Sequence, residues 1–135
     1  MKIFFKGIAP LVTYYYTGQY THIVLDEGKY LNMAYTIIDV GSHPNAYIGM
    51  GTKHRLAGRH YDHIELAVHG GLTYSEYGTG FFLRKGYYWI GWDYAHLGDC
   101  AAFAKMDLYS KNDKKWTFKE IFTHVLQAIE DFKKL

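Results

Sequence analysis

The stretch GYYWIGW, residues 86–92, carries the clearest strand pattern in this sequence. Its aromatic and β-branched residues suit the pleated, half-buried surface of a sheet. Because successive side chains of a strand point to opposite faces, Tyr88, Ile90 and Trp92 share one face. Asp93, the next residue, belongs to the other face. The stretch therefore predicts a strand with two distinct faces, around which the rest of the chain is arranged.

Further strand-like runs precede this stretch and are separated by turn residues. They cover residues 20–25, 30–40, 46–50 and 64–68, and residues 72–77 continue the last run after a bulge. We place the first turn at residues 26–29 and a polar surface loop at residues 51–63. Residues 101–109 fit either a short helix or a strand. The pattern is typical of a mostly sequential antiparallel sheet.

The chain ends in a helical pattern. Thr117 and Glu120 have the spacing of a capping box, in which each side chain bonds the other's backbone N–H. Apolar residues from 118 to 132 recur at intervals of three and four, which gives one apolar stripe. We therefore predict a single α+β domain over residues 1–135, an antiparallel, mostly sequential β-sheet with a C-terminal amphipathic helix packed on one face.

Composition excludes several classes of protein. The formal net charge of +2 over 135 residues argues against a protein that binds extended nucleic acid. The single cysteine, Cys100, allows neither an intramolecular disulfide nor a zinc site built from cysteines. No run approaches the roughly 18 apolar residues of a membrane span, so we expect no membrane partner. We expect a cytoplasmic protein without a cofactor, and a homo-oligomer is left open.

Polar groups gather at the ends of two predicted strands. His69 follows residues 64–68, and Asp93 and His96 follow residues 86–92. If these strand ends are neighbours, His69 and His96 form an acid–base pair in which Asp93 orients one imidazole. We assign these three residues as the candidate catalytic group. Alternatively, Asp93 caps a turn and His96 bonds a backbone carbonyl.

Other residues nearby have the chemistry of ligand binding. Aromatic rings stack on bases, arginines and a glycine pair hold phosphate, and hydroxyl groups donate hydrogen bonds. The candidate ligand-binding residues are Gly70, Gly71, Thr73, Tyr74, Ser75, Trp89, Trp92, Asp99, Arg55 and Arg59. His69, Asp93, His96 and Asp99 would also suit zinc, manganese or iron. Because no established metal motif is present, we assign no metal ligand.

Two motifs carry a resemblance to a known family. HGGLTYS at residues 69–75 and WIGWDYAHLGD at residues 89–99 are similar to paired motifs of an uncharacterised family of small phage- and prophage-encoded proteins. The likeness covers roughly residues 45–135. Trp92 and Tyr94 stand where that family usually has Phe and Cys. A third stretch of the family corresponds to TKHRLAGRHYDH at residues 52–63, in which His63 replaces an acidic residue. The resemblance implies a phage protein in the cytoplasm of an infected or lysogenic host, and a role in counter-defence.

From these features we expect a protein that binds a nucleotide-like small anion in a polar-aromatic pocket. In the counter-defence version it sequesters or hydrolyses a host nucleotide immune signal. One alternative is an inhibitor that contacts a host enzyme, with the motifs serving the fold. Another is a metal-dependent hydrolase. The catalytic interpretation requires His69 to lie within about 10 Å of Asp93 or His96.

Overall fold

The computed structural model describes residues 3–5, 13–16, 21–41, 43–96, 99–100 and 114–135. Seven strands form one antiparallel sheet in the order β1-β3-β4-β5-β7-β6, with β2 also paired to β3. The strands are β1 (Ile3–Phe5), β2 (Thr13–Tyr16), β3 (Thr21–Tyr30), β4 (Met33–Asp39), β5 (Pro44–Gly51), β6 (Tyr74–Tyr77) and β7 (Tyr87–Asp93). The short strands β8 (Asp99–Cys100) and β9 (Lys114–Lys115) pair in parallel.

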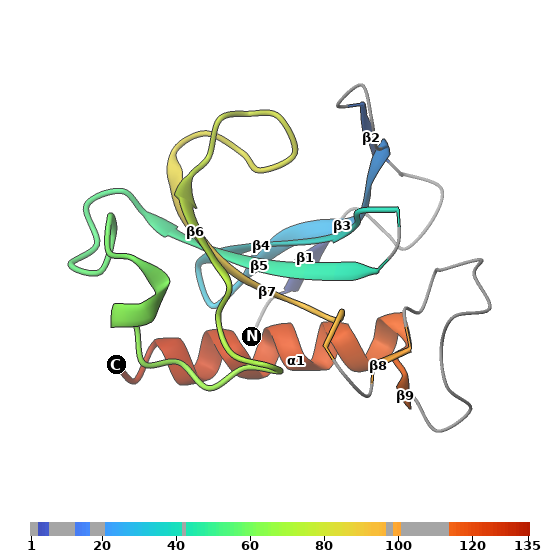
Figure 1. The fold of residues 1–135 in the computed structure, drawn as a ribbon. Coiled ribbons are helices and arrows are strands. Elements are labelled where there is room, and N and C mark those ends of the chain that lie inside the picture. The colour runs from blue at the N-terminus through green and yellow to red at the C-terminus, as the bar shows by residue number, and fades with distance from the viewer. Residues whose placement is uncertain (1–2, 6–12, 17–20, 42, 97–98, 101–113) are drawn as a thin grey trace.

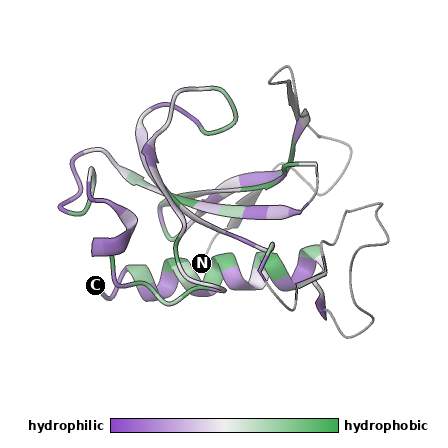
Figure 2. Cartoon of the chain, viewed as in Figure 1, coloured by the Kyte–Doolittle hydropathy of each residue, from purple (hydrophilic) through white to green (hydrophobic). Residues whose placement is uncertain are grey.

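One helix, α1 (Phe118–Phe132), lies across one face of the sheet (Figure 1). The predicted α+β class is therefore confirmed. The capping box is present, because Thr117 Oγ1 accepts a hydrogen bond from Glu120 N while the Glu120 carboxylate accepts one from Thr117 N. The apolar side of α1 faces the sheet and its polar side faces outward (Figure 2). Among the described residues, no helix is long and apolar enough to cross a membrane.

Strand β7 has the two distinct faces that its sequence predicts. Tyr88, Ile90 and Trp92 pack into the larger core, together with the buried residues of α1. Trp89 packs on the opposite face, in a smaller cluster with Tyr47 and Leu83 among others. The sheet thus has apolar residues on both sides, and α1 covers one of them.

The first predicted turn is wrong. Residues 26–29 continue β3, with a register irregularity between Val24 and Asp26. Asp26 is buried, and its carboxylate accepts a hydrogen bond of 3.1 Å from the Tyr35 hydroxyl. This bond satisfies an acidic group inside the sheet, which the local sequence does not reveal. The turn instead lies at Leu31 and Asn32, whose φ angles are 49° and 66°.

The predicted strand at residues 64–68 is also wrong. Both edges of β7 are occupied, one by β5 and one by β6, so this segment cannot pair with β7. Residues 64–68 pair with none of the strands that the structure describes, and they follow the short 3-10 helix η1 (Tyr61–His63). Their alternation survives as burial: Ile64 and Leu66 are buried, whereas Glu65 and Ala67 are exposed. Residues 101–109, for which the sequence fits either a helix or a strand, lie outside the described residues.

The turn at Leu31 and Asn32 gives a first prediction. Both residues have the positive φ of a type I′ hairpin turn, for which Asn-Gly is the preferred pair. We expect the double variant Leu31→Asn/Asn32→Gly to raise the free energy of unfolding by about 1 kcal/mol, measured by urea denaturation. Leu31→Ala is the control, because it shortens the side chain without removing the strain of a positive φ angle. A double variant no more stable than the wild type would contradict this assignment.

Candidate functional site

The residues that follow β7 meet the segment that precedes β6. The Thr73 hydroxyl donates a hydrogen bond of 3.1 Å to Asp93 Oδ2, and Thr73 N donates one of 2.9 Å to the Gly91 carbonyl. His96 Nδ1 lies 3.5 Å from Asp93 Oδ1. The rings of His69 and His96 are edge to face, with centroids 5.6 Å apart. The structure thus brings His69, His96, Asp93 and Thr73 into one cluster.

At Gly70 the backbone of the first motif packs closely against the His96 ring of the second. The φ angle of Gly70 is +69°, and a Cβ atom placed on it would lie 2.2 Å from His96 Cε1. Gly71 also has a positive φ, of +84°, but a Cβ there would meet nothing within 4 Å. The Gly71 N–H donates to the Val68 carbonyl at 3.0 Å. The expectation that this N–H is available to an anion is therefore wrong for Gly71.

His69 stands in a group of neighbouring aromatic rings. Its ring is nearly parallel to that of buried Tyr94, with centroids 4.8 Å apart and an interplanar angle of 8°. Trp116 meets His69 edge to face at 4.9 Å. The ring of His124 is also nearly parallel to that of Tyr94, with centroids 6.0 Å apart and an interplanar angle of 11°, and its centroid is 6.3 Å from that of His69. The rings of His69, Tyr94 and His124 therefore adjoin one another.

Beside this group of rings lies a pocket of about 340 Å³. Its volume falls in the range of small-molecule sites, roughly 300–1,000 Å³. It is lined by residues from the segment before β6, from β7, from α1 and from the residue before the helix cap: Ala67, Val68, His69, Trp92, Trp116, His124, Gln127 and Ala128. Of the candidate residues, His69 and Trp92 line the pocket. His96 and Asp93 are next to His69 but do not belong to the lining.

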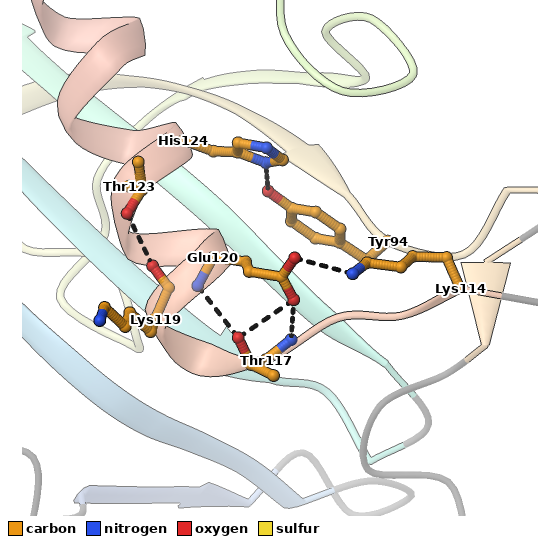
Figure 3. Close-up of polar contacts among 7 residues, drawn as sticks. All are labelled: Tyr94, Lys114, Thr117, Lys119, Glu120, Thr123 and His124. Atoms are coloured by element: carbon orange, nitrogen blue, oxygen red, sulfur yellow. Dashed lines mark hydrogen bonds and ion pairs between the residues drawn. The ribbon is translucent and has the colours of Figure 1, made fainter.

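Three side chains form a hydrogen-bonded chain from the core to the pocket. Trp92 Nε1 donates to the Tyr94 hydroxyl at 3.1 Å, and that hydroxyl lies 2.8 Å from His124 Nδ1 (Figure 3). Burial lowers the pKa of His124 below its usual 6.5, and the neighbouring His69 lowers it further, while Glu120 raises it. These contacts favour a neutral imidazole at His124.

A cation lies close to Trp116. Lys114 Nζ is 5.0 Å from the centroid of the Trp116 ring and 2.7 Å from Glu120 Oε2 (Figure 3). The hydrogen bond from Lys114 is the largest of the effects that lower the pKa of Glu120 to about 2. Lys114 thus presents a half-exposed positive charge beside a residue that lines the pocket.

Three candidate ligand-binding residues lie elsewhere. Trp89 and Tyr74 pack on the face of the sheet opposite α1, where the Trp89 indole N–H donates to the Arg84 carbonyl at 2.9 Å. The Ser75 hydroxyl accepts a hydrogen bond of 3.0 Å from Tyr61 N. None of the three lines the pocket, so their assignment to one site with His69 is wrong. The position of Trp89 is explained by the alternation of side chains along β7, which places Trp89 and Trp92 on opposite faces of the sheet.

The two arginines are also remote from the pocket. Gly51, from which their loop departs, pairs with Tyr87 at the start of β7, whereas Asp93 is at its end. At about 3.3 Å per residue, these ends are about 20 Å apart. Arg55 is exposed. Burial is the main cause of the lowered pKa of neighbouring His54, and the positive charge of Arg55 lowers this pKa further. Arg59 is exposed too, and its carbonyl accepts a hydrogen bond from the Tyr88 hydroxyl.

Asp99 has a described backbone only, in β8 opposite Lys114. Its role as a ligand-binding residue stays a prediction. Within the described part of the chain, no group of three or more His, Cys, Asp or Glu side chains could hold a metal ion. The described donors therefore give the metal-dependent hydrolase no site.

Three polar or aromatic side chains of the pocket lining were not predicted from the sequence: Trp116, His124 and Gln127. Tyr94, an aromatic residue of the second motif, connects two walls of the pocket through its hydrogen bonds. A signal for His124 and Gln127 was present, because both flank the apolar stripe of the helix at a spacing of three. Trp116 directly precedes the capping residue, a position from which a large ring packs back on the helix.

Comparisons with family models, curated proteins and solved structures found no match for the chain. The likeness of residues 69–75 and 89–99 to a phage family therefore stays a prediction. What bears on function is the arrangement of the described side chains around the pocket.

The glycine pair supplies a matched test. Gly70→Ala adds both backbone strain and a clash with the His96 ring, whereas Gly71→Ala adds strain alone. We expect Gly71→Ala to lower the free energy of unfolding by about 1–2 kcal/mol. Gly70→Ala should cost about 1–3 kcal/mol more, because the ring must be displaced. Urea denaturation of both variants measures the difference, and equal losses would contradict the close packing of His96 on Gly70.

The lowered pKa of His124 predicts a pH dependence of stability. Below its usual value of 6.5, the unfolded chain binds a proton that the folded chain resists, so His124 destabilises the fold as the pH falls. His22 and His54 act in the same direction, each mainly through burial. The free energy of unfolding of the wild type should therefore decrease from pH 7.5 to pH 5.

The variant His124→Asn isolates the contribution of one histidine. We expect its free energy of unfolding to decrease less steeply over the same pH range, because one of the three groups is absent. The difference in stability between the two proteins at pH 7.5 serves as the reference, since it measures the effect of the substitution while the imidazole is neutral. Identical slopes in the two proteins would contradict the burial of His124.

Proposed function

We propose that this protein binds a small nucleotide-like ligand, with its base stacked in the pocket beside His69. The observation that carries the proposal is the pocket of about 340 Å³ with four aromatic side chains in its lining: His69, Trp92, Trp116 and His124. Stacking of a base on an aromatic side chain contributes roughly 1–3 kcal/mol and accepts any base. A pocket with this lining suits a flat heteroaromatic ring better than an aliphatic chain.

Among the cationic side chains that the structure describes, Lys114 is well placed for the ligand's phosphate. Its ammonium group lies near the Trp116 ring, whereas Arg55 and Arg59 leave from the other end of β7. Its partner Glu120 also belongs to the capping box, so a phosphate that displaces Glu120 leaves that carboxylate with other hydrogen bonds. Lys114 therefore replaces the two arginines as the expected phosphate contact.

Binding without turnover is favoured over hydrolysis. Asp93 Oδ1 accepts a hydrogen bond from Ala95 N and Oδ2 accepts one from Thr73, so this carboxylate organises the turn after β7. Neither Asp93 nor His96 lines the pocket. A sequestering protein needs no general base, and this arrangement suits sequestration. Together with the resemblance to phage proteins, it supports capture of a host nucleotide immune signal.

The experiment is incubation of the purified protein with cyclic and ADP-ribose-derived nucleotides. Chromatography before and after heat release then identifies what was bound. Recovery of an intact nucleotide is the expected result. New products would instead indicate hydrolysis, for which the adjacent rings of His69 and His96 are the acid–base candidates. If no nucleotide is retained or changed, the proposal fails and an inhibitor of a host enzyme becomes the better interpretation.

Trp116→Leu tests the stacking wall directly. Loss of roughly 1–3 kcal/mol of stacking weakens binding of the retained nucleotide by about 5- to 150-fold, measured by isothermal titration calorimetry. Tyr77→Leu is the matched control, because Tyr77 is a 51% exposed aromatic residue outside the pocket lining. Its affinity should equal that of the wild type. Equal affinities for all three proteins would place the ligand elsewhere.

A further inference from the structure

Two polar side chains of α1 lie on the same wall of the pocket. His124 and Gln127 are three residues apart, so they are neighbours on the helix surface, and both belong to the pocket lining. Each has one hydrogen-bonding atom committed to a partner inside the protein. These partners decide which atom of each side chain is left for a ligand.

The hydrogen-bonded chain that ends at His124 indicates its tautomer. An indole N–H only donates, so the bond from Trp92 Nε1 uses a lone pair of the Tyr94 oxygen. The hydroxyl proton can then be donated to His124 Nδ1, 2.8 Å away. A neutral imidazole that accepts at Nδ1 carries its proton on Nε2. His124 thereby becomes a hydrogen-bond donor at Nε2.

Gln127 is oriented by Asp131. Gln127 Nε2 donates a hydrogen bond of 3.0 Å to Asp131 Oδ1. A carboxylate accepts and does not donate, so the amide nitrogen and not the amide oxygen must face Asp131. The Gln127 oxygen is therefore the atom left as an acceptor. Asp131 acts here as a positioning residue, since it belongs to the helix but not to the pocket lining.

We propose that His124 Nε2–H and Gln127 Oε1 form a donor–acceptor pair that recognises the edge of a nucleobase, which enters the pocket ahead of its phosphate. This inference rests on the proposed function and adds the orientation of the ligand. A base edge offers an acceptor beside a donor, as the ring nitrogen and amino group of adenine do. Phosphate and carboxylate groups offer acceptors only, and they would face the Gln127 oxygen unfavourably.

The two parts of the ligand are therefore bound by different groups of the protein. The base occupies the aromatic pocket, where the paired donor and acceptor select a complementary edge. The phosphate stays outside, near Lys114 and the Trp116 ring. A nucleoside should therefore retain most of the selectivity of its nucleotide, whereas a free phosphate should not compete for the pocket.

The first test measures selectivity with the full chain. The four nucleoside 5′-monophosphates are titrated by calorimetry, and the tightest is compared with an analogue that lacks only the edge donor, made by replacing the amino group with hydrogen or by methylating the ring N–H. We expect the analogue to bind the wild type about 5- to 150-fold more weakly, because the Gln127 oxygen loses its partner. In Gln127→Met, which has no acceptor, the two ligands should bind equally. Gln127→Glu, which keeps an acceptor, should still discriminate between them.

The outcomes separate this inference from the proposed function. If a nucleotide binds but Gln127→Met discriminates as well as the wild type does, the edge recognition is wrong and the binding function stands. If no nucleotide of the set binds, both fail. Gln127 is exposed, so its substitution should leave the fold intact, which circular dichroism checks. Inorganic phosphate should not displace the nucleotide, and displacement at comparable concentration would overturn the proposed orientation.

The second test needs no ligand. The 15N chemical shifts of the His124 ring at pH 7.5 distinguish a protonated Nε2 from a protonated Nδ1. We expect Nε2 to carry the proton in the wild type, and Tyr94→Phe, which lacks the hydroxyl, to shift the ring toward a mixture of tautomers. A wild-type ring protonated at Nδ1 would overturn the proposed donor, whatever the nucleotides do.

Discussion

The full occupation of β7 is the constraint on which the rest of this structure depends. Both of its edges are hydrogen-bonded, and both of its faces are buried. A strand in that position accepts no further neighbour, so the apolar segment at residues 64–68 has to find its burial elsewhere. It packs Ile64 and Leu66 into the core that α1 shares with the sheet. The pocket exists because that segment lies beside the helix instead of extending the sheet.

Much of the fold could be predicted because it depends on local patterns. The alternation in β7 and the capping box of α1 are properties of neighbouring residues, and both are present in the structure. The errors occurred where a distant partner decides the outcome. Asp26 looks like a turn residue until the Tyr35 hydroxyl is known to reach it. Residues 64–68 look like a strand until both neighbours of β7 are identified.

The candidate site shows the same division. His69, Asp93 and His96 were grouped by their positions after apolar runs, and the structure does place them together, although by a turn contact and not by paired strands. Trp89 and Tyr74 were grouped with them by residue type alone, and strand alternation sends both to the other face. His124 and Gln127 could only be recognised once the helix was oriented on the sheet. Residue type suggests chemistry, but the face on which a residue lies decides whether that chemistry is shared.

The contact between Gly70 and the His96 ring also constrains how this sequence can vary. No side chain fits at position 70 while an imidazole occupies the adjacent space. A larger residue at 70 becomes acceptable only if residue 96 becomes small, so the two positions should change together or not at all. They lie in different motifs, 26 positions apart along the chain. A contact in space, and not nearness along the chain, thus ties the substitutions that these two positions tolerate.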